Sequence, residues 1–237
     1  MNQTWTLTPD RYLSEPEVAE LLKKAEDLRT LGLARNQKQE VRDWAIIRFS
    51  LLSGLRANEL AMLKVADCFV GYGRSELVVR RGKGGKTRTV KIGDDLKKDI
   101  RWFLNWKQEN GELSEGAYLL KSQRSDHMSP NAIWRRWKVH CPQHRLHDAR
   151  HTYGTMLYSA SKDLRLVQAQ LGHSRPTVTA VYAQVTDEQA REGVKALENK
   201  VGRLAVEHPK ACELPRNLPR KPSKTAGKVA SSVRHSG

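Results

Sequence analysis

Cysteines are few in this chain and long apolar runs are missing, which excludes two broad classes of protein. The 237 residues hold three cysteines, Cys68, Cys141 and Cys212, an odd and widely spaced set that makes a poor disulfide framework. Such a set is typical of a reducing compartment. No run approaches the roughly 18 apolar residues that a membrane helix needs. The first residues also lack the basic and apolar regions of a secretion signal, so we expect a cytoplasmic protein.

Acidic residues are also in the minority. Lys and Arg number 42 against 26 Asp and Glu, which gives a formal net charge of +16 and a sequence pI near 10.0. This excess favours a polyanionic partner, because each neutralised phosphate releases counterions. Charge alone does not separate DNA from RNA or from an anionic membrane surface, and a merely basic soluble protein is the alternative.

The composition changes near the C-terminus. Residues 207–237 hold four prolines and seven Lys or Arg against two Glu, with almost no large apolar side chains. Such a segment cannot bury enough apolar surface to order itself. We therefore expect one folded domain over residues 1–206 and a basic, disordered tail over residues 207–237.

The apolar pattern predicts a mainly α fold with a small antiparallel β-sheet. Ser14 and Glu17 form a capping box, Ser129 caps a later helix, and breaks are expected at Ser53–Gly54 and at Gly172. Two strand-like runs that flank a glycine-rich turn predict a hairpin, over residues 77–80 and 87–92. Helices are predicted over residues 13–33, 41–53, 94–110, 129–139, 146–160, 163–172, 175–185 and 187–206, with a short one from about residue 58.

Two short motifs suggest cofactors, and neither fits. In "GKGGKT" the position that a phosphate-binding P-loop fills with its first Gly is Arg80, on a predicted strand. In "HCPQHRLHDARH" four histidines surround Cys141, but the paired C-x-x-C spacing of zinc sites is absent. We expect no nucleotide, metal or other cofactor. The pairs Trp102–Trp106 and Trp134–Trp137 have helical spacing, which favours core packing over base stacking.

Cleavage of a phosphodiester needs a nucleophile, cations for the non-bridging oxygens and a proton for the leaving oxygen. Arginine suits the second role because its planar fork meets phosphate oxygens bidentately. A tyrosine serves as nucleophile where neighbouring cations lower the free-energy cost of its phenolate. The chain carries these residue types in two stretches, "SGLRANELAMLKVADC" and "LHDARHTYGTMLYSASKDLRLVQAQLGHSRPTVTAVYAQV".

These stretches closely resemble the tyrosine recombinase (phage integrase) family over about residues 11–200. The family pattern is an Arg box, a hairpin Lys, a His-x-x-Arg box, an "LGH" His and a Tyr shortly after. The resemblance places six catalytic residues on this chain: Arg56, Lys83, His147, Arg150, His173 and Tyr182. It implies the family's DNA breaking-rejoining catalytic-domain fold.

The resemblance also implies a role for each of the six residues. Tyr182 attacks the scissile phosphate to form a 3′-phosphotyrosyl bond, and the two arginines clamp the non-bridging oxygens. His147 assists proton transfer from the tyrosine, His173 hydrogen-bonds the phosphate, and Lys83 protonates the leaving oxygen. No ATP is needed because the phosphotyrosine stores the bond energy.

Some assignments have competitors. Lys86 lies in the same hairpin turn as Lys83, which we take as the catalytic lysine. Tyr153 and Tyr158 lie in the helix after His147, where packing is the expected role. Glu59 is expected to support Arg56 or its helix. The nearby residues His144, Arg145 and His151 receive no role.

The sequence departs from many relatives in that its Arg box comes early, so we expect no separate N-terminal core-binding domain before it; Ala149, where relatives often carry Leu, is a smaller departure. The expected function is site-specific DNA recombination, for integration, excision or inversion of a mobile or invertible element. The expected partners are double-stranded DNA, further copies of the chain in a tetramer on synapsed sites, and accessory DNA-bending proteins, in the cytoplasm and on the nucleoid. Two alternatives stay open: a DNA-binding regulator with lost chemistry, and a type IB topoisomerase-like relaxation activity.

Overall fold

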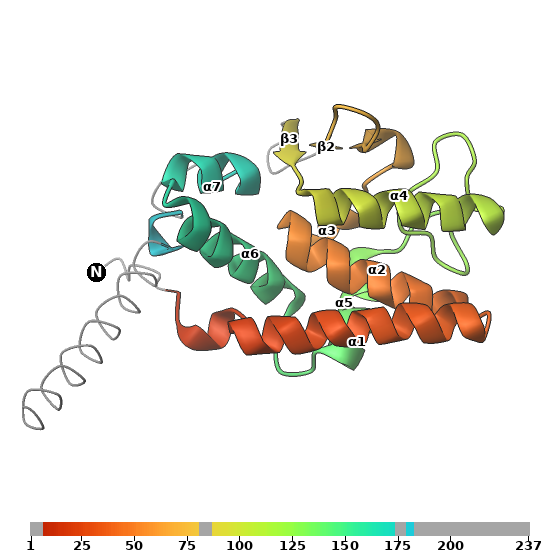
Figure 1. Ribbon diagram of the computed structural model, residues 1–237, viewed down its shortest axis with the longest axis horizontal. Coiled ribbons are helices and arrows are strands. Elements are labelled where there is room, and N and C mark those ends of the chain that lie inside the picture. The colour runs from red at the N-terminus through yellow and green to blue at the C-terminus, as the bar shows by residue number, and fades with distance from the viewer. Residues whose placement is uncertain (1–6, 81–86, 174–178, 183–237) are drawn as a thin grey trace, which may run out of the picture. The chain divides into compact units, whose positions relative to one another are not determined.

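The computed structural model describes residues 7–80, 87–173 and 179–182. Within them the chain forms helices joined to a small sheet (Figure 1), which confirms the predicted class. The helices are η1 (Pro9–Arg11), α1 (Glu15–Ala34), α2 (Lys38–Ser53), α3 (Ala57–Ala61), η2 (Val65–Asp67), α4 (Asp94–Glu109), α5 (Pro130–His140), α6 (Leu146–Ser161) and α7 (Leu164–Leu171). The strands are β1 (Cys68–Phe69), β2 (Glu76–Val79) and β3 (Arg88–Lys91).

Helix α2 lies at the centre of the helical part. Helices α1, α4, α5 and α6 all pack against it, with α1 and α4 on opposite sides in the view of Figure 1. Its residues Trp44, Ile46, Ile47 and Phe49 are buried although they point in different directions around the helix. A helix that is enclosed by neighbours is apolar on all sides instead of along one stripe. The sequence of α2 has this pattern.

The predicted tryptophan packing is confirmed for three of the four side chains. Trp106 and Trp137 are buried, and Trp102 packs against the core with its ring 4.9 Å from that of Trp44. The prediction is wrong for Trp134, which is 46% exposed. Helix α5 buries Ile133 and Trp137, which lie four residues apart on one face; Trp134, about 100° further round the helix, lies off that face.

The sheet is antiparallel with the strand order β1-β2-β3. Leu77 pairs with both Cys68 and Val90, and its side chain is buried with those of Val79 and Val90. The hairpin prediction is thereby confirmed for its strands, while the turn, residues 81–86, lies outside the described residues. Strand β1 was not predicted, because two residues are too few to show an alternating pattern.

Local sequence signals set the ends of the helices. The Glu17 carboxylate accepts the backbone N–H of Ser14 at 2.8 Å, and the Ser129 hydroxyl accepts that of Ala132 at 3.1 Å. Gly54 ends α2 and Gly172 ends α7, with φ of 62° and 64° in the left-handed region that glycine adopts without strain. The predicted caps and breaks are therefore confirmed at these positions.

A small second apolar cluster lies apart from the main core. It joins Leu7, Val167, Leu171 and Val181 to Tyr182, and Tyr153 packs against it. Residues 179–182 form a helical turn inside the predicted helix over residues 175–185. The rest of that helix, the helix predicted over residues 187–206 and the domain boundary at residue 206 lie outside the described residues.

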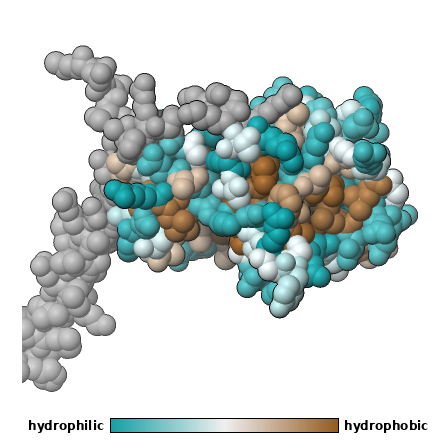
Figure 2. Space-filling model, turned by 90° about the horizontal axis from the view of Figure 1, so that it is seen from above, coloured by the Kyte–Doolittle hydropathy of each residue, from teal (hydrophilic) through white to brown (hydrophobic). Residues whose placement is uncertain are grey.

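The surface of the described part combines polar and apolar areas. Figure 2 shows a face on which hydrophobic residues gather in patches between hydrophilic ones. None of the helices within the described ranges has the length and apolar character that a bilayer span requires.

Candidate active site

Glu59 lies at the centre of a cluster of arginines. Because Gly54 turns the chain between α2 and α3, Arg56 becomes the residue that precedes α3, and Glu59 lies one turn later. The Glu59 carboxylate accepts the backbone N–H of Arg56 at 2.9 Å and its Nη1 at 2.8 Å. This short local loop fixes the Arg56 guanidinium, which remains 26% exposed, at the surface end of the cluster.

Arg88 and Arg150 approach the same carboxylate from distant parts of the chain. Arg88, on β3, donates to both Glu59 oxygens, at 2.7 and 2.8 Å. The Arg150 Nη1, on α6, lies 3.9 Å from Glu59 Oε2. Three guanidinium groups thus meet at one carboxylate, and the local excess of positive charge suits an anionic ligand.

The Glu59 carboxylate stays ionised in this setting. Burial opposes its charge, but the hydrogen bonds from Arg88 and Arg56 outweigh that effect and lower its pKa to about 2. Glu59 therefore orients the arginines as a fixed anion and takes no part in proton transfer near neutral pH.

Arg150 is held by the protein backbone as well as by charge. Its Nη1 donates to the Gly54 carbonyl at 2.7 Å, and its Nη2 donates to the Leu171 carbonyl. Burial and the neighbouring Arg56 lower its pKa to about 10, so the guanidinium still carries its charge at neutral pH. The side chain therefore ties the turn before α3 to the end of α7.

The glycines at these two turns are also needed for close approach. A Cβ on Gly54 would lie 2.4 Å from Tyr153 Cδ1, and a Cβ on Gly172 would lie 2.6 Å from Arg88 Cδ. Backbone conformation and crowding thus require glycine at both positions. Tyr153, an alternative nucleophile by position, is the packing partner of the first glycine.

Tyr182 lies beside histidines from α6 and from the end of α7. Its Oη is 3.1 Å from His151 Nδ1, and its ring lies parallel to that of His173, with centroids 6.3 Å apart. His173 Nδ1 also lies 3.1 Å from the Thr179 hydroxyl. The His147 ring meets that of His151 edge to face at 4.6 Å. Three imidazoles are thus gathered near one phenol.

Burial favours the neutral form of each of these side chains; the neighbouring arginines add to this effect at the histidines and oppose it at the tyrosine. Burial raises the pKa of Tyr182 to about 12, against the opposing effects of Arg150 and Arg56. Burial, with Arg150 and Arg56 as lesser causes, lowers the pKa of His173 to about 4. The pKa of His147 is also lowered, by burial and by Arg150. In this state the tyrosine is a protonated phenol that is 1% exposed.

Five of the six residues predicted from the sequence are described, and the structure brings them together. Arg56 and Arg150 meet at Glu59, while His147, His173 and Tyr182 lie on the adjoining parts of α6 and the segment after α7. Both arginines affect the pKa of Tyr182, so the two groups are within electrostatic reach. Lys83, like its competitor Lys86, falls in residues 81–86, outside the described residues.

Sequence reasoning missed two members of the site. Arg88 receives no role from the sequence, because charged residues alternate with apolar ones in ordinary strands and its partner Glu59 is 29 residues away. His151 was left without a role, although its spacing of four residues from His147 places both on one face of α6. Glu59 was expected to support Arg56, and its contacts agree with that.

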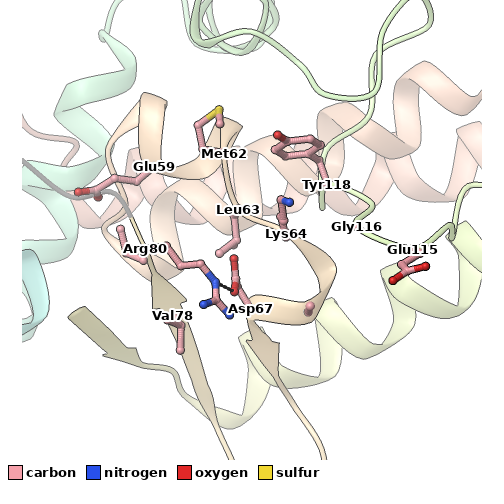
Figure 3. Close-up of a pocket in the computed structure, with 12 residues that line it drawn as sticks. Glu59, Met62, Leu63, Lys64, Asp67, Val78, Arg80, Glu115, Gly116 and Tyr118 are labelled. Atoms are coloured by element: carbon pink, nitrogen blue, oxygen red, sulfur yellow. Dashed lines mark hydrogen bonds and ion pairs between the residues drawn. The ribbon is translucent and has the colours of Figure 1, made fainter. Parts of the chain in front are cut away.

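A cavity of about 540 Å³ is lined in part by Glu59, the carboxylate of the arginine cluster. Figure 3 shows Lys64, Asp67 and Arg80 near one another in its wall, with the Glu59 carboxylate turned away from them. Arg80 Nε donates to Asp67 Oδ1 at 2.5 Å, and Lys64 Nζ lies 5.5 Å from the centre of the Tyr118 ring. Asp67, Arg80 and Lys64 therefore already have partners within the wall. Across the described part of the chain, no group of three or more His, Cys, Asp or Glu side chains has a metal-binding arrangement.

Known proteins share this sequence pattern and fold. The chain is 30% identical over 192 residues to tyrosine recombinase XerA of Pyrococcus horikoshii, which covers 78% of this chain and 60% of the relative. A crystal structure of XerA recombinase matches with a TM-score of 0.63 and 25% identity over 81% of this chain and 65% of the other. The XerH site-specific recombinase in its post-cleavage complex on a palindromic difH substrate has a TM-score of 0.66 at 20% identity, over 83% and 54% of the two chains.

The chain spans about 60% of the length of the first curated relatives that it matches. The profile described as "Phage integrase family" matches residues 11–189, a range that includes the whole arginine cluster and Tyr182. The sequence motifs, the helical fold with its small sheet, and these matches lead to one assignment: the chain belongs to the phage integrase family.

Proposed function

We propose that this protein is a site-specific DNA recombinase that cleaves and rejoins strands through a covalent 3′-phosphotyrosyl intermediate. The observation that carries the proposal is the packing of Tyr182 against Leu171, whose carbonyl accepts a hydrogen bond from Arg150, while Arg150 and Arg56 converge on Glu59. A phenol beside fixed cations is the arrangement that attack on a phosphodiester requires. Integration, excision and inversion of a mobile or invertible element are the reactions that such chemistry serves.

The two arginines act on the phosphate. Both side chains donate hydrogen bonds to the non-bridging oxygens. Arg56 is partly exposed at the edge of the cluster, and Arg150 is held by two backbone carbonyls. Their positive charge offsets the negative charge that develops in the transition state. His173, half-buried at the end of α7, adds a hydrogen bond to the same phosphate.

Tyr182 supplies the nucleophile. Its Oη forms a bond to phosphorus as the bond to the 5′ oxygen breaks, and the hydroxyl proton passes toward His147. Because Tyr182 is 1% exposed, the phosphate reaches the phenol only after the side chains that cover it make room.

Lys83 completes the cycle in this proposal by giving its proton to the leaving 5′ oxygen. The 5′-hydroxyl of a partner strand then attacks the phosphotyrosine, which releases Tyr182 and restores a phosphodiester. No bond energy is lost between the two steps, so no nucleotide cofactor is consumed.

Double-stranded DNA is the proposed partner, and the net charge of +16 supports it. Relatives that match in fold include XerH bound to its difH substrate. We assign catalysis to residues 1–206 and further phosphate contacts to the basic tail, residues 207–237. A tetramer on two synapsed sites, assisted by DNA-bending proteins on the cytoplasmic nucleoid, is the assembly in which strand exchange takes place.

A nicked suicide duplex tests the proposal, because loss of a short fragment after cleavage traps the covalent adduct. The wild-type protein forms an adduct that survives denaturing electrophoresis, and Tyr182→Phe binds the same duplex without forming one. The matched control Tyr153→Phe keeps adduct formation. A normal adduct yield from Tyr182→Phe would show that another residue is the nucleophile.

The same experiment separates the two alternative functions. A DNA-binding regulator binds the duplex and yields no adduct with any variant. A type IB topoisomerase yields an adduct and relaxes a supercoiled plasmid, but gives no product that joins two sites.

A further inference from the structure

His151 lies on α6 one turn after His147, and no role in the reaction proposed above uses it. The side chain is buried, and its ring packs edge to face against that of His147 with 4.6 Å between centroids. His151 thus contacts both His147, the proposed proton acceptor, and Tyr182, the proposed nucleophile.

The contact of His151 is with the reacting atom itself. Its Nδ1 lies 3.1 Å from Tyr182 Oη, a normal hydrogen-bond distance, in an enclosed part of the molecule. The ring of the tyrosine is placed by the same helix, because the Gly154 Cα lies so close that a Cβ would stand 2.7 Å from Tyr182 Cζ. Gly154 therefore sets where the phenol ring packs, while the hydroxyl direction is left to a hydrogen-bond partner.

His151 is a weak base in this position. Burial, with His147 and Arg150 as lesser causes, lowers its pKa to about 3. The ring is neutral at neutral pH, and Nδ1 can offer a lone pair to the hydroxyl of Tyr182, which is itself protonated. A base this weak can accept a hydrogen bond but does not retain the proton, so its contact orients the hydroxyl.

We propose that His151 is a positioning residue for the nucleophile, whose Nδ1 accepts the Tyr182 O–H and fixes the direction of the phenol oxygen. This role rests on the proposed function, in which that oxygen attacks phosphorus. His147 remains the group toward which the proton passes. Until that transfer, the hydrogen bond to His151 fixes the direction of the lone pairs on the Tyr182 oxygen.

Two substitutions separate the hydrogen bond from simple packing. In His151→Asn the side-chain amide can present its oxygen near the position of Nδ1, whereas in His151→Gln the longer side chain places it near that of Nε2. We expect His151→Gln to form the adduct on the nicked duplex about five- to tenfold more slowly, the loss of one ordinary hydrogen bond. His151→Asn stays within about twofold of wild type, since it keeps the acceptor.

A second measurement needs no DNA. Tyr182→Phe removes the hydroxyl and should lower the melting temperature by about 2–4 °C in the wild-type background. In the His151→Gln background the same substitution should lower the melting temperature by clearly less, because the hydrogen bond to residue 151 is already absent. This non-additivity is a signature that two independent packing contacts do not produce.

The outcomes distinguish the two proposals. If wild type forms no adduct, the proposed function fails, and the melting experiment alone decides whether the contact with Tyr182 exists. If wild type forms the adduct, equal rates for His151→Gln and wild type overturn the role of His151 and leave the function intact. Equal losses in both variants with additive melting shifts overturn it as well, since the ring would then only fill space.

Discussion

Among the buried carboxylates in the described part of the chain, Glu59 and Glu112 are both surrounded by cations but serve different ends. At Glu59, arginines donate to both oxygens, and one of them, Arg56, keeps a quarter of its side chain exposed. At Glu112, Arg42 Nη2 lies 2.5 Å from Oε1, and Lys107 Nζ lies 3.7 Å from Oε2 with no exposure at all. Only the first cluster adjoins the histidines and the tyrosine.

The second cluster is also less complete. Within the described part of the chain, Lys107 Nζ, Glu112 Oε2 and Arg42 Nε lack hydrogen-bond partners. Burial is the main cause that lowers the pKa of Lys107, and Glu112 offsets it only in part. A cluster of charged side chains therefore indicates a reaction site where its polar groups are hydrogen-bonded, where one member is exposed to solvent and where groups that move protons lie beside it. A cluster that is fully buried and lacks some of these hydrogen bonds instead joins parts of the fold.

Replacing one arginine in each cluster gives the largest contrast. Arg150→Lys keeps the charge but cannot hold both backbone carbonyls and a phosphate at once. We expect adduct formation to fall by about 100- to 1,000-fold with little change in DNA affinity. Arg42→Lys should leave the rate per folded molecule within about twofold. Single-turnover assays with the nicked duplex measure both, and a defect in affinity alone for Arg150→Lys would make that arginine a DNA-positioning group.

The two glutamates form the next matched pair. Glu59→Gln and Glu112→Gln each leave buried cations without an anion, so each should lower the free energy of unfolding by about 3 kcal/mol. Only Glu59→Gln should also slow adduct formation, by about tenfold, because it releases Arg56 and Arg88. Urea unfolding and the suicide assay report the two effects separately. Equal slowing in both variants would erase the distinction between the clusters.

A smaller effect of opposite sign is expected at Lys107. Lys107→Met removes a buried ammonium that has no hydrogen-bond partner among the described residues and leaves the Arg42–Glu112 pair in place. We expect the free energy of unfolding to rise by about 1 kcal/mol. Lys98→Met, at an exposed position on the same helix, is the control and should change nothing measurable. Destabilisation by Lys107→Met would mean that its ion pair with Glu112 outweighs the burial of its charge.

Between pH 4 and 6.5 the pH dependence of stability should reflect the histidines beside the first cluster. The folded-state pKa values of His151 and His173 lie near 3 and 4, below the ordinary 6.5, so the unfolded chain takes up these protons first as the pH falls. The stability linked to them is complete above pH 6.5 and is lost as the pH falls toward 4. The loss linked to Glu59, between its ordinary pKa of 4.5 and about 2, follows at lower pH.

Substitution of His173 tests whether its protonation is linked to stability in this way. His173→Gln should reduce the slope of unfolding free energy between pH 4 and 6 by up to about 1.4 kcal/mol per pH unit. Glu112→Gln should leave that slope unchanged, because no histidine belongs to its cluster. Chemical denaturation at several pH values measures the slopes, and an unchanged slope in His173→Gln would mean that His173 titrates normally in the folded protein.

The sequence predicts this molecule well where the signal is local or carried by family motifs. Capping residues such as Ser14 and turn glycines such as Gly54 determine their helix ends through contacts within a few residues, so they can be read from the chain. Tertiary partners cannot be read in this way. Arg88 is 29 residues from Glu59, and the exposure of Trp134 depends on which face of α5 meets α2 and α3. His151 is an example of both cases. Its spacing from His147 can be read from the sequence, but its contact with Tyr182, 31 residues away, cannot.

The backbone anchoring of Arg150 has a consequence for the energetics of the proposed reaction. Two of its five N–H groups are directed at the carbonyls of Gly54 and Leu171, and the remaining ones point in directions fixed by the planar guanidinium. The side chain thus loses its rotational freedom when the protein folds, before any substrate arrives. A phosphate entering the site meets dipoles that need no reorganisation as its charge changes, so the arginine acts through preorganisation as well as through its charge.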